Sequence, residues 1–222
     1  MRSKIELHNV DCLPFIQNCK DNEFDLAIVD PPYGLDIANM DMGVGNGVKH
    51  TKLKNRKWKP KDWDKQIPSK KYFEELKRVS INQIIWGGNY FDLPPCYGFC
   101  IWEKGSPEGM SFSDCEFAWH SFKKVAKLYK YSTYKNKNKI HPTQKPVKLY
   151  EWLLMNYAKE GDKILDTHGG SMSIAIAVHN MNVINKMNLS LDLCELDKEY
   201  YDEGKKRYEN HIKQKTIFNM QT

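Results

Sequence analysis

Short apolar runs alternate with segments of helical spacing along most of the chain. Apolar runs predict strands over 4–10, 24–30, 83–88, 97–104, 115–122, 163–167 and 189–196, with a weaker one over 126–131. Helical spacing predicts helices over 13–19, 70–79, 142–159, 171–181 and 197–214. Strands that alternate with helices, several of them apolar throughout, are typical of a parallel sheet covered on both faces. We therefore predict a doubly wound α/β fold, in one domain over residues 1–222.

Two lysine-rich segments interrupt this pattern. Residues 36–70 have no sustained period, which predicts a long basic loop or a small recognition insert, and 123–140 reads as a second basic loop. The window 49–71 has ten basic residues against two acids, and 123–145 has eight lysines and no acid, so each carries +8. Because the net charge of the whole chain is +6, the residues outside these two windows carry a net charge of −10. This segregation favours a polyanion-binding face, although two solvated lysine-rich loops would share the same composition.

Several classes of protein are disfavoured by what the sequence lacks. No apolar run approaches the roughly 20 residues of a membrane span, and the first residues lack the apolar core of a signal peptide, so we expect a cytoplasmic protein. The six cysteines form no CxxC pair and are read as buried free thiols. The histidines show no ligand spacing, so we expect no metal site.

The stretch ILDTHGGSMSIAIAV, residues 164–178, reads as strand, turn and helix. Asp166 ends a buried strand, two glycines follow, and a helix of small residues starts at about Ser171. Glycines let backbone approach a ligand closely, and a helix start offers free N–H donors. Glu195 ends the next strand, where an acid commonly binds ribose hydroxyls. These features predict half of a nucleoside-cofactor site, and the absence of G-x-G-x-x-G disfavours a nicotinamide enzyme.

The stretch DPPY, residues 30–33, follows another buried strand. Two consecutive prolines stiffen the turn, because each fixes φ and lacks an N–H. Such a turn directs the Asp30 carboxylate and a backbone carbonyl, both acceptors, to one place beside the flat ring of Tyr33. Acceptors next to a flat ring suit a planar substrate with an amino group, which points to a nucleobase.

These motifs together resemble the S-adenosylmethionine-dependent DNA amino-methyltransferases, over most of the chain. DPPY resembles their catalytic motif, ILDTHGGSMSIAIA their cofactor loop, HPTQKP at 141–146 an adjoining cofactor segment, and CELDKEYYDEGKKR their ribose-binding acid with its helix. The catalytic motif precedes the cofactor loop, as in the circularly permuted β-class. WGGNYF and HPTQKP resemble small adenine-modifying members, including phage-encoded ones. The implied fold is the Rossmann-like class I methyltransferase fold, with a mostly parallel seven-stranded sheet and an antiparallel edge hairpin.

The resemblance also implies roles for individual residues and partners. Asp30, Pro31, Pro32 and Tyr33 would be catalytic, with Tyr33 stacking on a flipped base. S-adenosylmethionine would be held by Asp11, Cys12, Asp30, Lys145, Asp166, Thr167, His168, Gly170, Ser171, Ser173 and Glu195. Within this set, Lys145 would meet the cofactor carboxylate and Asp11 its adenine. Double-stranded DNA would contact Lys52, Lys54, Arg56, Lys57, Lys135, Lys137 and Lys139. Small β-class relatives often pair, so a homodimer is a further expectation.

Three residues depart from the family pattern. Thr167 and His168 stand where Pro and Phe are usual, and Met172 stands where a glycine is usual. A methionine at that position would crowd the cofactor unless Gly169 and Gly170 supply the room. Alternatives to adenine N6 methylation therefore stay open: cytosine N4 methylation, for which SPPY would be more typical, and a catalytically silent DNA-binding subunit. A protein-glutamine methyltransferase is disfavoured, since that family carries NPPY.

Overall fold

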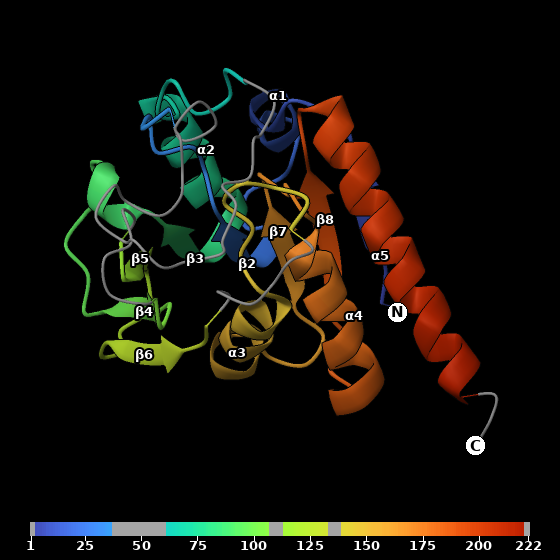
Figure 1. Cartoon of the computed structure of the whole chain (residues 1–222). Coiled ribbons are helices and arrows are strands. Elements are labelled where there is room, and N and C mark those ends of the chain that lie inside the picture. Colours follow the sequence, from blue (N-terminus) through green and yellow to red (C-terminus); the bar gives the residue numbers. More distant parts are fainter. Residues whose placement is uncertain (1–2, 37–60, 107–112, 133–138, 220–222) are drawn as a thin grey trace, which may run out of the picture.

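The computed structural model describes residues 3–36, 61–106, 113–132 and 139–219. These residues form one sheet whose strands are β1 (Ile5–His8), β2 (Phe24–Val29), β3 (Ser80–Trp86), β4 (Phe99–Glu103), β5 (Cys115–His120), β6 (Lys127–Lys130), β7 (Lys163–Asp166) and β8 (Ser190–Cys194). Their order is β1-β8-β7-β2-β3-β5-β4-β6 (Figure 1). Only β5, among these strands, runs antiparallel to its neighbours. The predicted doubly wound, mostly parallel sheet is confirmed.

The sheet has eight strands in the described residues rather than the expected seven, because β6 adds to the edge beside β4. The antiparallel pair β4–β5 is therefore not at the edge of the sheet. Strand β6 confirms the weaker strand predicted over 126–131, inside the segment 123–140 that was otherwise read as a basic loop. The Tyr129 ring stacks on Trp152, with 5.1 Å between centroids. Lys127 Nζ donates to Asn156 Oδ1 at 2.7 Å. One aromatic contact and lysines with neighbouring partners are sufficient to dock this polar strand.

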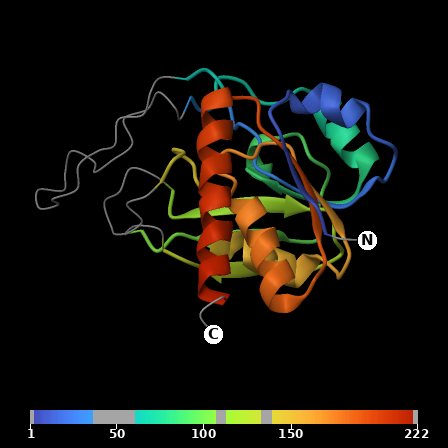
Figure 2. The same ribbon diagram turned by 90° about the vertical axis from the view of Figure 1, so that its right-hand side faces the viewer.

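Within the described part of the chain, five α-helices cover the two faces of the sheet, namely α1 (Cys12–Gln17), α2 (Lys70–Val79), α3 (Val147–Tyr157), α4 (Ser173–Asn185) and α5 (Lys198–Asn219). Helices α1 and α2 share one buried cluster with the sheet, which includes Ile16 and Leu76. Helices α3 and α4 share the other, which includes Leu153 and Ile174, and α5 packs on that side (Figures 1 and 2). None of the described helices has the length and apolar character needed to cross a membrane.

Helix α3 begins later than expected. The sequence predicts a helix from Pro142, but the first helical residue is Val147, and Pro146 is the extended N-cap with φ −72° and ψ 144°. The residue before a proline is disfavoured in the helical region, which keeps Lys145 out of the helix. Residues 141–145 instead form a turn in which Gln144 N donates to the His141 carbonyl at 3.2 Å. This non-helical segment carries Lys145 to the sheet.

The chain reverses its direction of progress across the sheet between β7 and β2. From β7 the chain proceeds to β8 on one side, whereas from β2 it proceeds to β3 on the other. Ligands in open α/β sheets bind at such a switch point, beyond the carboxyl ends of the strands. The motifs singled out in the sequence follow these central strands, so the fold brings them to one edge.

Candidate active site

Three acids stand at the carboxyl ends of adjacent strands. Asp30 follows β2, Asp166 ends β7 and Glu195 follows β8. A cavity of about 490 Å³ opens at this edge, within the usual range for a small-molecule site. Of the expected cofactor residues, Asp11, Cys12, Asp30, Lys145, Thr167, His168, Gly170, Ser171, Ser173 and Glu195 line it. Asp166 is buried beneath the lining and accepts a hydrogen bond from His168 N at 3.0 Å.

Glu195 organises the glycine loop after β7. Its Oε2 accepts from Gly170 N at 2.7 Å, and its Oε1 accepts from Asp197 N at 2.8 Å. Gly170 has a φ of +48°, a left-handed conformation that glycine adopts without a Cβ penalty. The acid expected to bind ribose thus also joins the loop to the start of α5.

Two residues of this loop explain how it accommodates its departures from the family pattern. A Cβ on Gly169 would lie 2.2 Å from Leu193 Cδ2, so only glycine fits there. Met172, at φ +58°, precedes α4, which begins at Ser173 rather than at Ser171. The Met172 side chain is fully buried, approaches Gly204 and does not line the cavity. The crowding expected from Met172 is therefore not observed.

The DPPY turn carries a hydrogen-bonded carboxylate. Tyr33 Oη donates to Asp30 Oδ1 at 2.6 Å, and Lys145 Nζ lies 2.5 Å from Asp30 Oδ2. Lys145 Nζ also donates to Tyr33 Oη at 3.2 Å. Pro32 lines the cavity, and Pro31 is buried. The turn thus presents Asp30 to the cavity, with both carboxylate oxygens already engaged.

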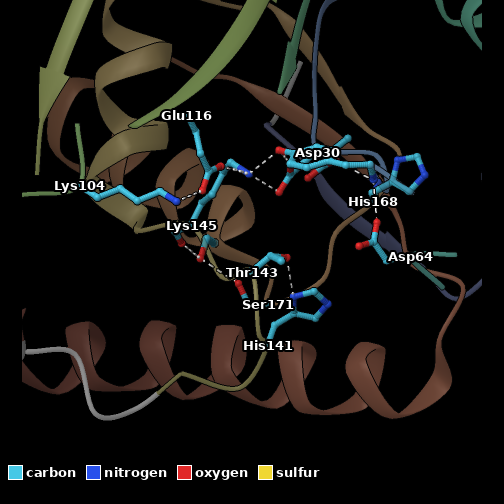
Figure 3. Close-up of polar contacts among 12 residues, drawn as sticks. Asp30, Asp64, Lys104, Glu116, His141, Thr143, Lys145, His168 and Ser171 are labelled. Atoms are coloured by element: carbon cyan, nitrogen blue, oxygen red, sulfur yellow. Dashed lines mark hydrogen bonds and ion pairs between the residues drawn. The ribbon is translucent and has the colours of Figure 1, made fainter. Parts of the chain in front are cut away.

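Lys145 belongs to a chain of alternating charges (Figure 3). Its Nζ contacts Glu116 Oε2 at 3.0 Å, and Glu116 Oε1 in turn contacts Lys104 Nζ at 2.7 Å. Lys145 also lies over the Trp86 ring, 5.1 Å from its centroid. The sequence placed Lys145 at the cofactor carboxylate, whereas the structure places its amino group between Asp30 and Glu116. A cofactor role for Lys145 remains a prediction.

Burial dominates the ionisation of these groups. It raises the pKa of Asp30, opposed chiefly by Lys145, and raises the pKa of Asp166 to about 8. Burial alone would raise the pKa of Glu116, but Lys145 and Lys104 lower it to about 2. Burial would likewise depress the pKa of Lys145, but Asp30 and Glu116 raise it. Lys145 is therefore cationic and favours the ionised form of Asp30.

The same cavity contains neutral imidazoles and a neutral thiol. Burial lowers the pKa of His168 to about 4 and that of His141 to about 3. Burial also raises the pKa of Cys12 to about 12. The described residues contain no group of three or more His, Cys, Asp or Glu placed to bind a metal ion.

Comparison with known proteins agrees with this geometry. Residues 49–206 match the N6_N4_Mtase family model, described as DNA methylase. The chain belongs to this DNA methylase family. The type II methyltransferase M2.MboI of Moraxella bovis is 23% identical over 260 residues, covering 94% of this chain and 92% of the relative. The expected membership of the DNA amino-methyltransferases is confirmed, with the methylated base left open.

Solved structures of two methyltransferases share the fold of this DNA methylase. The M1.HpyAVI–SAM complex matches with a TM-score of 0.56 and 21% identity, over 91% of this chain and 99% of the other. The cytosine-N4-specific PvuII DNA methyltransferase matches with a TM-score of 0.56 and 13% identity, over 92% and 86%. At these identities the likeness shows the fold, which is the predicted class I methyltransferase fold.

Tyr33 of this DNA methylase is held by an aromatic neighbour and a glycine. Its ring stacks on Tyr90, with 5.1 Å between centroids and 18° between planes. Tyr90 ends a 3₁₀ turn, η2 (Gly88–Tyr90), which follows Gly87. A Cβ on Gly87, at φ +69°, would lie 2.2 Å from the Tyr33 ring. The expected stacking of Tyr33 on a base stays a prediction, and Tyr90 is a second flat ring beside it.

Most of the expected DNA-binding residues lie outside the described residues, namely Lys52, Lys54, Arg56, Lys57, Lys135 and Lys137. Lys139 is described and half-buried, just before the HPTQKP segment. Elsewhere in the basic windows, some described lysines have acidic partners: Lys65 pairs with Asp62 and Lys130 with Glu103. The positive windows are therefore partly neutralised within the fold.

Sequence reasoning missed two acids that support the DPPY turn. Glu116 stands at the start of the apolar run CEFAWH, where an acid facing Lys145 could not be foreseen without the pairing of β5 with β3. Asp64 stands inside a lysine-rich window, yet it is only 1% exposed. A buried acid requires hydrogen-bond donors, but nothing in the local sequence distinguished Asp64 from the exposed Asp62.

Proposed function

We propose that this chain transfers the methyl group of S-adenosylmethionine to the N6 amine of adenine in DNA, after the base flips out of the duplex. The observation that carries the proposal is the Asp30 carboxyl group, paired with Lys145 on a double-proline turn, at the wall of the cavity that the glycine loop and Glu195 also line. The family match and the likeness to M1.HpyAVI, which was solved with S-adenosylmethionine, support it.

The residues that line the cavity suit S-adenosylmethionine. Acidic groups at the strand ends favour a ligand with a positive sulfonium and ammonium. Glu195 retains lone pairs for ribose hydroxyls beyond its two backbone bonds. The absence of the Met172 side chain from the lining leaves room beside the glycine loop. When bound, the cofactor supplies an activated methyl group on a positively charged sulfur.

The residues of the turn act on the target amine. An aromatic amine is a poor nucleophile, because its lone pair is spread into the ring. The Asp30 carboxylate and the Pro31 carbonyl accept hydrogen bonds from the amine, and they stabilise the positive charge that its nitrogen gains. Lys145 opposes the effect of burial and favours the ionised form of Asp30, in which the carboxylate accepts rather than donates. The amine proton leaves after transfer, so no strong base is required, and alignment alone can supply about 7–11 kcal/mol.

The aromatic pair Tyr33 and Tyr90 lies beside Asp30 rather than on the cavity wall, and Tyr90, which is 44% exposed, offers a flat ring to a flipped base. Extruding a base from a duplex costs a few kcal/mol, and stacking on an aromatic ring returns about 1–3 kcal/mol per base. The choice of adenine rests on Asp rather than Ser at position 30. Cytosine N4 methylation uses the same chemistry and is the alternative, supported by the similar fold of the cytosine-N4-specific PvuII enzyme.

The test is incubation of the protein with unmethylated genomic DNA and methyl-labelled S-adenosylmethionine, followed by nucleoside mass spectrometry. We expect label on adenine N6. Label on cytosine N4 would instead identify cytosine as the methylated base, with the same mechanism. Asp30→Ala should abolish transfer but leave cofactor binding, measured by calorimetry, within a few-fold of wild type. Absence of both label and cofactor binding would identify a silent DNA-binding subunit.

A further inference from the structure

Residues 61–69, called here the bridging segment, cross from one side of the cavity to the other. Trp63, Gln66, Ile67, Pro68 and Ser69 all line the cavity. The Trp63 ring lies 5.1 Å from the His141 ring, in the HPTQKP segment. Nothing in the DPPY or glycine-loop motifs assigns a role to this segment, although it touches both halves of the site.

Asp64 ties the bridging segment to the catalytic turn. Asp64 Oδ1 accepts from Tyr33 N at 2.7 Å and from Gly34 N at 3.1 Å, and Asp64 is buried (Figure 3). Pro31 and Pro32 have no N–H, so the first backbone donors after Asp30 are those of Tyr33 and Gly34. Asp64 binds both with charge-assisted bonds, which are stronger than neutral ones. The backbone of the turn is therefore held from one point.

Lys61 ties the other end of the bridging segment to the cofactor side. Its Nζ pairs with Asp197 at 2.7 Å and with Glu199 at 3.0 Å, at the start of α5. It also lies over the Tyr200 ring, 4.8 Å from the centroid. Asp197 N donates to Glu195, so this anchor adjoins the acid expected to bind ribose. Only two residues, Asp62 and Trp63, thus separate the cofactor-side anchor from the turn anchor.

We propose that Asp64 is a positioning residue for methyl transfer, which holds the DPPY turn in reactive geometry while Lys61 anchors the same segment beside the cofactor. The inference rests on the proposed function and extends it to residues outside the family motifs. A carboxylate shared by two adjacent N–H groups fixes the direction in which the turn presents Asp30. A misplacement of about 1 Å in such a group can cost about 100-fold in rate.

The test compares Asp64→Ala, Asp64→Asn and the matched control Asp62→Ala. Asp62 lies two residues earlier, is 81% exposed and forms a surface ion pair with Lys65. Asp64→Ala should lower kcat about 100-fold at saturating DNA and cofactor, with the cofactor Kd within about threefold. Asp64→Asn keeps an oxygen acceptor and should recover most of kcat. Asp62→Ala should match wild type in both parameters.

Hydrogen exchange gives a readout that needs no activity. In a peptide spanning residues 29–35 the prolines contribute no amide, so faster exchange at Tyr33 and Gly34 in Asp64→Ala is measurable against Asp62→Ala. Unchanged exchange with unchanged kcat would overturn the proposal. The proposal would also be overturned if the loss of kcat in Asp64→Ala came with a comparable loss of cofactor affinity and a clear drop in Tm, since Asp64 would then be merely structural. If wild type transfers no methyl group to DNA, the proposed function fails, and exchange still decides whether Asp64 holds the turn.

Discussion

Removing the Lys145 ammonium is the sharpest perturbation of the site. Lys145→Met keeps the length of the side chain but deletes the charge at a residue that is 3% exposed. The deleted group contacts Asp30 at 2.5 Å and Glu116 at 3.0 Å. At an effective dielectric constant of about 20, each contact is worth about 6 kcal/mol before the cost of desolvation. Both carboxylates would be left buried, Asp30 without a cation and Glu116 with Lys104.

The net loss of stability should be about 3–5 kcal/mol, the range for breaking one partner of a buried ion pair. For a chain of this size that lowers Tm on the order of 10 °C. The rate should fall by at least about 100-fold at pH 7, as for loss of one preorganised electrostatic contact. Burial already raises the pKa of Asp30, and Lys145 is the main influence that lowers it.

The pH profile of kcat separates this account from simple misfolding. The titratable groups that remain around Asp30 in the described structure are Tyr33, Glu116, Tyr150 and Asp166, none of them a cation. The pKa of Asp30 must therefore rise in Lys145→Met, and the acid limb of the profile should shift to higher pH. The activity assay is run from pH 5.5 to 9.5 beside thermal unfolding.

A matched control is Lys148→Met, three residues further along. Lys148 is 60% exposed and pairs with Glu151, so its loss should cost no more than about 0.5 kcal/mol. It should leave the pH profile unchanged. The reasoning is refuted if Lys145→Met keeps both the Tm and the acid limb of wild type.

Three further predictions concern the cofactor pocket, acid stability and DNA. Burial raises the pKa of Asp166 to about 8, so binding of cationic S-adenosylmethionine at pH 7 should release a proton. Calorimetry in buffers of different ionisation enthalpy should detect it, and Asp166→Asn should remove the buffer dependence. Burial lowers the pKa of His141 to about 3, so the unfolded chain gains a proton first as the pH falls below about 6.5, and stability drops by about 2 kcal/mol by pH 5. Denaturant titrations at pH 7 and 5 should show a smaller difference for His141→Gln. Neutralising Lys52, Lys54, Arg56 and Lys57 should weaken DNA binding and reduce its salt slope by about 0.9 per lost phosphate contact, and an unchanged slope would exclude them from the interface.

The features predictable from sequence were those encoded over short distances. Apolar runs located the strands, and an acid at the end of such a run was therefore placed at a strand end. The carboxyl ends of parallel strands lie at one edge of the sheet, so these acids were expected near one another. Asp30 and Glu195 could therefore be placed on the same cavity before their contacts were known. The start of α3 was misjudged, because the helix was taken to open at Pro142, whereas Pro146 keeps Lys145 out of it; the apolar stripe lies within the observed helix.

Sequence alone determined the strand-and-helix order and the DNA amino-methyltransferase motifs, and most of the motif residues it singled out line the cavity. The tertiary structure alone decided what holds those residues. Glu116 reaches Lys145 because β5 pairs antiparallel with β3, and Asp64 reaches the DPPY turn because the bridging segment folds back across the cavity. Met172 stays off the cavity wall because its side chain turns into the core against Gly204. Such contacts join residues tens of positions apart, and chain closure, burial and charge pairing select them together, so no local pattern specifies them.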